Sequence, residues 1–265
     1  GMKAMRKRKR VKTDARDAYE LANLLRLGSL PEGYIAPVEL RELRELVRHR
    51  RQLTKAATSV KAQIRALLAK HGIRLPAAAL ESQAGQDQLD MVVLPECASG
   101  RLESRRRLML HLDNEIDALD VELDRQLKNH PGYRNLLKVK GIGPVLAAIF
   151  VVEIGDITRF KTAEQLACWA GLTPRHYASD LKVRRGHISK EGCALVRWAA
   201  VEAVQRQCEP AVARVREDIL ARRGRQARNI AKVAAGRKML EVVFYVLRDG
   251  QARCLTATVA DPKAA

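Results

Sequence analysis

The sequence predicts a mainly α-helical protein in which a long coiled-coil arm joins a compact helical domain. Three observations point to this class. Aromatic residues are only 4% of the chain, helix-favouring Ala, Leu, Arg and Glu are abundant, and apolar residues recur at helical spacing over two long stretches. Apolar residues make up 47% and charged residues 30% of the 265 positions, which is enough to build a core. We therefore exclude a disordered chain and a β-sandwich or β-barrel.

The chain is strongly basic. Its 49 Lys and Arg outnumber 30 Asp and Glu, which gives a formal charge of +19 and a pI near 10.2. Such an excess repels itself in a compact chain unless a polyanion neutralises it, and nucleic acid is the most common polyanionic partner. The composition therefore favours a nucleic-acid-binding protein.

Cysteines and apolar runs indicate the compartment. The five cysteines form no C-x-x-C pair, so we expect no zinc site, no disulfide framework and a reducing environment. The longest apolar run, residues 145–152, is too short to span a bilayer. The N-terminus lacks the apolar stretch of a signal peptide. We expect a cytoplasmic protein without a membrane partner.

Residues 1–36 hold a basic run and one predicted helix. The run, residues 3–12, contains seven Lys and Arg and no acid, and it is either a solvated tail or an arm that contacts nucleic acid. Thr13 is a suitable N-cap for the helix, and Gly28 closes it. The apolar positions of this helix recur at helical spacing: Ala18, Leu21, Ala22 and Leu25.

Residues 37–130 carry two heptad patterns, which predict the coiled-coil arm. Residues 72–100 between them contain several Pro and Gly, and we expect a loop-like connector there. The two helices pair either as an antiparallel hairpin or between subunits. The first seam consists of Leu43, Leu46, Arg50, Leu53, Ala57, Val60, Ile64 and Leu67. The second consists of Leu102, Arg105, Met109, Leu112, Ile116, Leu119, Leu123 and Gln126. Because polar seam residues make a thin core, we expect a homodimer or higher homo-oligomer.

The sequence His130-Pro131-Gly132 breaks the second helix, so a compact domain is expected over residues 131–250 with a frayed tail over 251–265. Within it, Gly141-Ile142-Gly143 before Pro144 has the pattern of a helix-hairpin-helix turn. Two glycines permit a tight turn whose N–H groups face a phosphate beside a helix N-terminus. The alternative is an ordinary turn between helices. We predict DNA contact at Gly141, Ile142 and Gly143, through the backbone and without sequence choice.

The second half of this domain alternates helices with basic segments. Thr162 and Gln165 fit a capping box for a helix that ends at Gly171. Residues 172–188 lack helical spacing and are expected to form an exposed loop or short hairpin. Ser189 is expected to cap a helix from Lys190 to Gln207. Residues 206–238 hold ten Lys and Arg against three acids, a further basic surface, and helical patterning resumes over residues 239–247.

Three segments together resemble one family. Residues 12–18 (KTDARDA), the arginine-rich stretch 43–68 and residues 136–200 are similar to insertion-sequence transposases of the IS110 family, which are recombinases guided by a structured RNA. The third segment is the specific one, because "GIGP", "FKTAEQLACWAGLTP" and "RRGHISKEG" occur in order. The resemblance implies a RuvC-like nuclease domain whose four acids hold Mg²⁺ and a C-terminal domain whose serine links to DNA. It also implies DNA and guide-RNA partners in a prokaryotic, nucleoid-associated protein.

By this resemblance, Asp14 and Asp17 match the last two acids of the nuclease domain. At i and i+3 they share a helix face, so both can reach one Mg²⁺, although an acid pair in a first helical turn also serves as an ordinary dipole cap. Only thirteen residues precede Asp14, which leaves no room for the family's upstream strands. We therefore expect a helical remnant of the nuclease domain, an incomplete Mg²⁺ cage, and a truncated chain unable to cut DNA alone.

Ser179 matches the family's nucleophilic serine. The basic residues expected to contact DNA around it are Lys182, Arg184, Arg185 and Lys190. Asp180 stands where the family usually has glycine, and its carboxylate is unfavourable beside an incoming phosphate. Ser189 is the competing nucleophile, but helix capping explains it more simply.

Three functions follow from these observations. The first is a DNA transposase or site-specific recombinase that cleaves and transfers strands. The second is a non-catalytic nucleic-acid-binding remnant of such an enzyme. The third is a coiled-coil assembly protein with incidental charge, which differs from the others in having no salt-sensitive affinity for nucleic acid.

Overall fold

The structure is a computed structural model that describes residues 13–30, 33–76, 79–179 and 182–251; for residues 176–179 and 182–185 it describes the backbone alone. The chain divides into two units, Gly1–Val38 and Glu39–Ala265. The basic run 3–12 and the tail from residue 252 lie outside the described residues. The described part is mainly helical with one two-stranded sheet, as predicted.

The first unit contains helix α2 (Asp14–Arg26). The predicted cap is confirmed, because the Thr13 hydroxyl accepts the Arg16 N–H at 3.4 Å. Gly28 follows the helix with φ 61°, which suits a residue without a side chain. No residue of α2 is buried. Leu25 is 67% exposed, so the apolar stripe is not covered in this unit.

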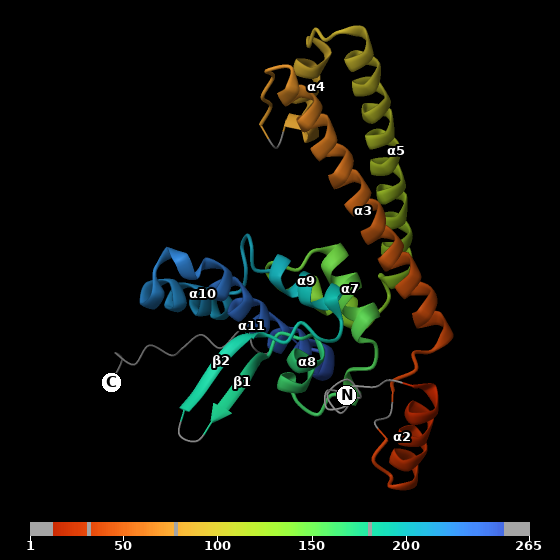
Figure 1. Cartoon of the computed structure of the whole chain (residues 1–265), viewed down its shortest axis with the longest axis vertical. Coiled ribbons are helices and arrows are strands. Elements are labelled where there is room, and N and C mark those ends of the chain that lie inside the picture. The colour runs from red at the N-terminus through yellow and green to blue at the C-terminus, as the bar shows by residue number, and fades with distance from the viewer. Residues whose placement is uncertain (1–12, 31–32, 77–78, 180–181, 252–265) are drawn as a thin grey trace. The chain divides into compact units, whose positions relative to one another are not determined.

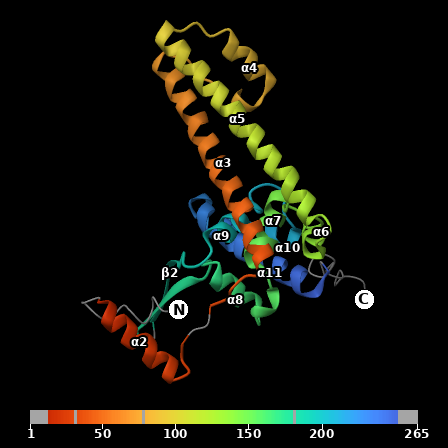
Figure 2. The ribbon, with the colours of Figure 1, turned by 90° about the vertical axis from the view of Figure 1, so that its right-hand side faces the viewer.

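The second unit begins with a helical arm (Figures 1 and 2). Helix α3 (Val38–Lys70) and helix α5 (Glu96–Leu127) form its two sides. Arg50 near the start of α3 pairs with Asp120 near the end of α5, with Nη2 to Oδ2 at 2.8 Å. Arg105 Nε donates to Gln63 Oε1 at 3.1 Å further along. Of the two arrangements expected from sequence, the antiparallel hairpin within one chain is therefore the one observed.

The connector is more ordered than predicted. The expectation of a loop over residues 72–100 was wrong, because this segment contains a short η2 (Ala79–Glu81) and helix α4 (Gln83–Asp90), and α5 already begins at Glu96. The Ser82 hydroxyl caps α4 by accepting the Gly85 N–H at 3.2 Å. Pro95 is the N-cap of α5 and provides no side-chain cap for the helix.

The core of the arm differs from a strict seam. It extends beyond the two long helices, because Leu80 of η2 and Leu89 of α4 pack into it. On α5, the predicted seam position Gln126 is exposed, and its neighbour Leu127 is buried in the core of the lobe. The end of α5 therefore packs against the lobe and does not continue the seam of the arm. The buried members are Ala57, Val60, Ile64, Leu67, Leu68, Leu80, Leu89, Ala98, Leu102, Met109 and Leu112.

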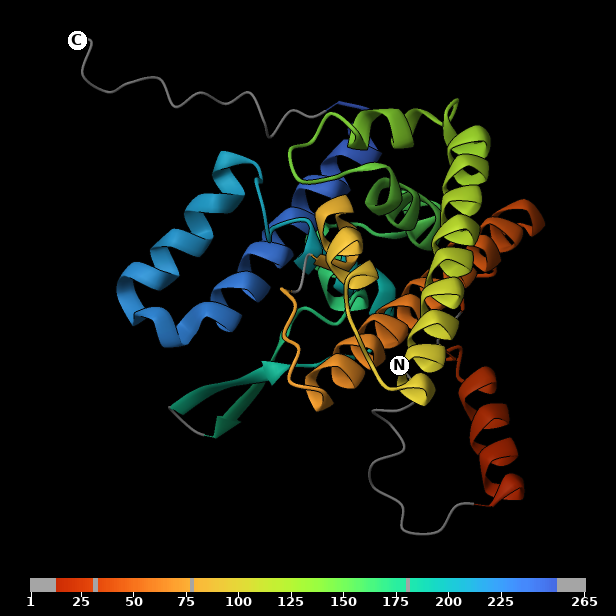
Figure 3. The ribbon, with the colours of Figure 1, turned by 90° about the horizontal axis from the view of Figure 1, so that it is seen from above.

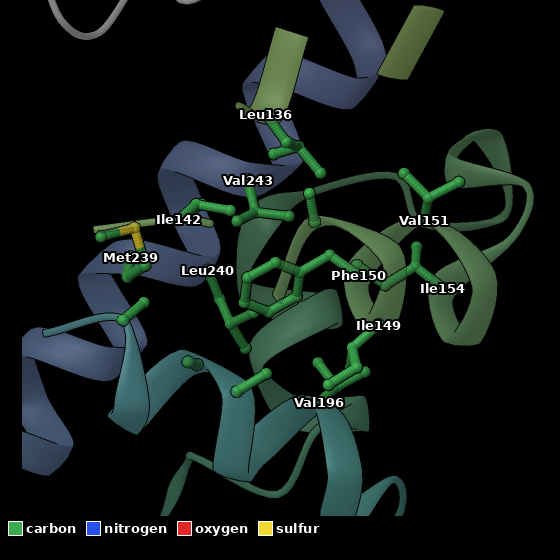
Figure 4. Packing of buried hydrophobic residues seen from close by; sticks show 14 of the residues in the cluster. Leu136, Ile142, Ile149, Phe150, Val151, Ile154, Val196, Met239, Leu240 and Val243 are labelled. Carbon is green, nitrogen blue, oxygen red and sulfur yellow. The ribbon is translucent and has the colours of Figure 1, made fainter. Parts of the chain in front are cut away.

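The rest of the second unit is a helical lobe. Its elements are α6 (Pro131–Leu136), α7 (Pro144–Ile154), η3 (Ile157–Arg159), α8 (Ala163–Trp169), β1 (Pro174–Ser179), β2 (Lys182–Ile188), α9 (Ala194–Glu202), α10 (Pro210–Arg223), η4 (Arg225–Ala227) and α11 (Arg228–Asp249). Helix α7 is apolar on nearly all sides and lies in the middle of the core, where Phe150 is fully buried (Figure 4). Val196 of α9 and Leu240 of α11 pack around it.

Two helix starts in the lobe test the sequence predictions. The Thr162 hydroxyl accepts the Gln165 N–H at 3.4 Å, so the predicted cap of α8 is confirmed. The Gln165 side chain accepts the Lys161 N–H at 2.8 Å, one residue earlier than in a standard capping box. The predicted cap at Ser189 was wrong, because α9 starts four residues later with Cys193 at its N-cap. The helix also ends at Glu202, since the chain turns before α10.

Arginines of α3 join the arm to the lobe. Arg44 donates to the carbonyls of Val152 and Glu153, both at 3.0 Å. These carbonyls belong to the last turn of α7, where a helix has no internal donors and its dipole favours a cation. Arg48 then forms a two-bond ion pair with the Glu153 carboxylate at 2.8 and 3.0 Å. Glu153 is 3% exposed, whereas the Arg48 side chain is 50% exposed.

In the part of the chain that the structure describes, no helix combines the length and apolar character that a membrane span requires.

The unequal burial of this ion pair predicts unequal losses of stability. We expect Arg48→Met to lower the free energy of unfolding by about 2–3 kcal/mol, because it leaves a buried carboxylate without its partner. Glu153→Met should cost about 1 kcal/mol, since the half-exposed Arg48 side chain can be hydrated. The double variant should recover much of the loss of Arg48→Met. Urea denaturation of all four proteins checks this, and equal losses in the two single variants would contradict it.

A second junction lies where α5 ends and α6 begins. His130 caps α6, with its Nδ1 accepting the Tyr133 N–H at 3.3 Å. The Tyr133 hydroxyl donates to Asp124 Oδ1 of α5 at 3.0 Å. Burial, followed by this hydrogen bond, raises the pKa of Tyr133 to about 12. Burial lowers the pKa of His130. The junction therefore requires a neutral imidazole.

This predicts a pH-dependent contribution to stability. Because the pKa of His130 in the folded chain lies below its ordinary value of 6.5, its contribution is present above that value and is lost as pH falls through the folded pKa. His130→Asn keeps a side chain that caps a helix at every pH. The difference in unfolding free energy between the native protein and this variant should be constant above about pH 7 and should then decrease toward pH 5. A difference that does not change with pH would refute the prediction.

Candidate nucleic-acid interface

The predicted serine and cations lie on one β-hairpin. Strands β1 and β2 pair antiparallel, and Ser179, the last residue of β1, pairs with Lys182, the first of β2. Tyr177 pairs with Arg184, and the next pair along the hairpin contains Arg185. The structure thus places these four predicted residues on one hairpin. Of the exposed loop and the short hairpin expected for residues 172–188, the hairpin is the one observed. Asp180 lies outside the described residues.

Two glycines hold the base of this hairpin against the start of α9. A side chain on Gly171 would place its Cβ 2.2 Å from the Glu191 carbonyl oxygen, and one on Gly192 would come within 1.8 Å of the Trp169 carbonyl oxygen. Both glycines have positive φ, 71° and 78°. Only glycine fits such close approaches in this conformation. The segments on either side of the hairpin are therefore in direct backbone contact.

Hydrogen bonds complete this base. The Ser189 N–H donates to the Thr173 carbonyl at 2.9 Å, and the Lys190 N–H donates to the Gly171 carbonyl at 3.2 Å. From α9, the Arg197 guanidinium donates to the Ala170 carbonyl at 2.7 Å. The hairpin is consequently tied at both ends to the lobe.

Lys190 and Ser189 gain a different role from the one predicted. Lys190 has φ 56°, the left-handed conformation that costs a residue with a side chain about 1–2 kcal/mol. Its side chain is exposed. The Ser189 hydroxyl accepts the Glu191 N–H at 3.5 Å and caps no helix. Helix capping therefore does not explain Ser189, which stays a competitor of Ser179 as the nucleophile.

Aromatic residues stabilise the neighbouring surface. The Arg159 guanidinium stacks 4.3 Å from the centre of the Phe160 ring and 4.7 Å from the Trp169 ring. Arg51 of the arm stacks 4.0 Å from the Trp198 ring of α9. These contacts fix the helices that flank the hairpin.

Cys193 lies at the N-cap of α9, close to the hairpin base. Its Sγ is 3.7 Å from Glu153 Oε2. Burial raises the pKa of the Cys193 thiol, and the nearby Glu153 carboxylate raises it further. A thiol with a raised pKa is a poor nucleophile at neutral pH. The cysteine is a packing residue, and serine hydroxyls are the better candidates for covalent chemistry.

The glycine turn joins α6 to α7 and only part of it faces outward. Ile142 is 4% exposed, its side chain packs in the core beside Val243, and its N–H donates to the Val139 carbonyl at 3.0 Å (Figure 4). A Cβ on Gly141, which has φ 96°, would lie 2.3 Å from the Ala203 carbonyl oxygen. A Cβ on Gly143 would meet no atom within 4 Å. Of the three residues predicted to contact DNA, Gly143, the N-cap of α7, is thus the one with open space beside its Cα.

A shallow depression opens beside this turn. The turn lines it together with Leu146 of α7, and Glu202 and Arg206 near the end of α9 complete the rim. Both charged residues are exposed. The buried Glu209 carboxylate accepts the Lys140 N–H at 2.8 Å and holds the turn in place. The depression thus offers one cation and one anion beside the open Gly143 backbone.

Asp14 and Asp17 lie in the other unit, in the first turn of α2. Asp14 is exposed and Asp17 half-buried. Among the described residues, no three His, Cys, Asp or Glu side chains come together as metal ligands would. Two carboxylates do not by themselves make a cage for Mg²⁺, so these residues do not fit a complete metal site. Their position in the first turn of α2 also agrees with a role in stabilising the helix dipole.

Some residues of this region were not found from the sequence. Gly171, Gly192 and Glu209 act through backbone contacts between distant segments, and a single sequence gives no signal for such contacts. Arg206 was counted only as part of a basic surface. One local signal was present at Glu209. This acid is followed by Pro210, and proline at the first helical position indicates a helix start, here that of α10.

Comparison with known proteins agrees with this arrangement. A profile of the "Transposase IS116/IS110/IS902 family" matches residues 133–217, and an IS110 DEDD transposase profile matches residues 1–73. A protein of Pseudomonas aeruginosa named as a family 20 transposase is 28% identical over 253 residues, 89% of this chain and 73% of that protein. A protein of Sinorhizobium fredii named as a transposase is 27% identical over 193 residues, 73% of this chain and 47% of that protein.

A third relative comes from a defined insertion element. The 43.6 kDa protein of insertion element IS110 from Streptomyces coelicolor is 30% identical over 167 residues, 63% of this chain. The chain spans 39% of that relative's length. The two profiles match both the N-terminal and the C-terminal segments that carry the resemblance, and the profile over residues 133–217 covers the part of the lobe that carries the hairpin. The chain belongs to the IS116/IS110/IS902 family of transposases.

Proposed function

We propose that this chain is the arm-and-lobe portion of a DNA transposase that binds DNA and a structured guide RNA and that cleaves and transfers DNA strands. The observation that carries the proposal is the basic hairpin at Ser179, whose base is tied to the lobe by glycine contacts and hydrogen bonds. A nucleophile must be held in place relative to its phosphate, and a rigid support serves this purpose. We further propose a cytoplasmic, nucleoid-associated protein that assembles as a homo-oligomer through the arm.

The proposed chemistry is a phosphoryl transfer to serine. The Ser179 oxygen attacks the phosphorus of a phosphodiester, an Oγ–P bond forms, and the bond to the leaving deoxyribose oxygen breaks. The serine proton passes to solvent or base, and the leaving oxygen gains a proton. Attack by the hydroxyl of another strand reverses these steps and frees the serine. Lys182, Arg184 and Arg185, on the paired strand, supply positive charge for the phosphate oxygens.

The family also indicates a metal requirement. The DEDD transposase profile that matches residues 1–73 implies a divalent ion, and Mg²⁺ is the expected one. We propose that Asp14 and Asp17 contribute two of its ligands. Because the described residues supply no third ligand near them, no step of the mechanism is assigned to the ion.

The incomplete set of metal ligands favours a second candidate function. A chain with an incomplete set of metal ligands can keep its basic surfaces and bind nucleic acid without cutting it. The two functions differ in one respect: the first requires a serine–DNA bond, and the second does not.

The choice of serine can be tested with the family's nuclease half supplied as a fusion. We expect Ser179→Ala to abolish the covalent protein–DNA adduct formed on DNA of the insertion-element ends, because no other hydroxyl replaces the nucleophile. Ser189→Ala is the matched control, since it removes a hydroxyl ten residues away beside the same hairpin. Denaturing gels and mass spectrometry detect the adduct.

The outcomes separate the candidates. Loss in Ser189→Ala with retention in Ser179→Ala would make Ser189 the nucleophile. A fusion that binds DNA and never forms an adduct would favour the non-catalytic function.

The depression beside Gly143 predicts two opposite effects. If a phosphate lies there, Arg206→Gln should weaken binding to a DNA duplex several-fold and reduce the salt slope by about one, because one counterion-releasing contact is lost. Glu202→Gln should strengthen binding, because it removes an anion from the same rim. Fluorescence anisotropy over a salt series measures both. Changes of the same sign would place the phosphate elsewhere.

A further inference from the structure

The hairpin formed by α10 and α11 carries an unusual concentration of arginine at its tip. From Ile219 to Leu240 the chain contains seven Lys and Arg and no acid. Four of these residues lie where α10 ends and α11 begins, and we define them as the arginine tip: Arg222, Arg223, Arg225 and Arg228. All four side chains are exposed.

The tip differs from the helix surfaces elsewhere in this unit. Several cations on the other helices are paired, as Arg106 is with Asp90 and Glu103, and Arg125 with Glu122. Within the described residues, no carboxylate lies at ion-pair distance from any member of the arginine tip. Arg222 even has Asp218 four residues before it, yet its Nε donates to the Asp218 backbone carbonyl at 3.1 Å. An ordinary solvated helix face mixes charges, and this one does not.

The root of the hairpin is held firmly. Arg216 of α10 donates to the Val204 carbonyl at 3.0 Å, and Lys232 of α11 donates to Gln205 Oε1 at 2.9 Å. Val212 and Ala231 are fully buried. The two inner cations are therefore used for anchoring, which leaves the outer four to face a partner. Because ordering the support in advance reduces the entropy lost on binding, such a surface is suited to recognition.

The chemistry of the tip indicates its ligand. All four cations are arginines, whose planar guanidinium groups donate two parallel hydrogen bonds to phosphate oxygens. Clustered arginines repel one another unless an anion neutralises them. A repeating phosphate ligand satisfies several of them at once. The hairpin and the β1–β2 hairpin also project from the same side of the lobe (Figures 1 and 3).

We propose that the arginine tip binds the phosphodiester backbone of a double-stranded nucleic acid, as a third contact in addition to the Ser179 hairpin and the glycine turn. This inference rests on the proposed nucleic-acid-binding function and adds the surface that provides sequence-independent affinity. Backbone contacts of this kind fix position and contribute no base choice.

The test neutralises the tip. Replacing all four tip arginines with Gln should lower the affinity of the whole chain for the duplex by at least about tenfold near 0.15 M salt and reduce the salt slope by about three to four. The matched control replaces four exposed cations at the far end of the arm: Lys70, Arg74, Arg101 and Arg107. It changes the net charge by the same amount and should alter affinity less than about threefold. A tip variant with four lysines keeps the net charge but loses the two-bond geometry of the guanidinium groups, so its affinity should lie between those of the native chain and the Gln variant.

Binding is measured with two probes, a random 20-base-pair DNA duplex and an RNA hairpin of similar length, which show which backbone the tip binds. A loss of affinity of the Gln variant for either probe supports the proposal. Circular dichroism and thermal melting confirm that each variant is folded. Equal losses in the tip and control variants, or unchanged binding in the tip variant, overturn the proposal while leaving the proposed function intact. A native chain that binds neither probe overturns both.

Discussion

The carboxylate of Glu153 lies buried between the arm and the lobe, where it accepts two hydrogen bonds from Arg48. An ionised carboxylate with so little contact with water is stable only when it is paired. Arg44, one turn earlier on α3, caps the last carbonyls of the same helix α7. The Cys193 thiol at the start of α9 lies against this carboxylate as well. The arm, the central helix of the lobe and the helix after the hairpin are therefore coupled through one charged group.

The arginines of the second unit divide into those that bond to groups inside the protein and those that face solvent. Arginines that face the interior serve the fold: Arg44 and Arg48 at the arm, Arg197 at the hairpin base and Arg216 at the root of α10. The exposed arginine tip lies on the α10–α11 hairpin, which projects from the lobe on the same side as the β1–β2 hairpin (Figure 3). Part of the excess charge of +19 thus satisfies backbone carbonyls and a buried carboxylate, and the arginine tip presents four further cations to solvent.

The candidate site was accessible from sequence to a limited degree. The family motifs indicated Ser179 and its flanking cations, and the break in helical spacing indicated an exposed segment. The motifs did not show how the hairpin is supported. Gly171 and Gly192 contact carbonyls some twenty residues away in the chain, and the Ser189 cap failed because those contacts delay the start of α9. The local preference of a serine for an N-cap was overridden by tertiary structure.

The sequence by itself determined the helical class, the two long helices of the arm and the break at residue 130. The signals for these features are composition, helical periodicity and helix-breaking Pro and Gly residues, and each of them acts within a few turns of the chain. Only the tertiary structure decided that the arm helices pair antiparallel within one chain and that residues 72–100 contain a helix. It alone decided that Ile142 faces the core and that Glu153 receives Arg48. Each of these outcomes depends on which distant groups meet, and burial and ion pairing between distant groups leave no periodic trace in the sequence.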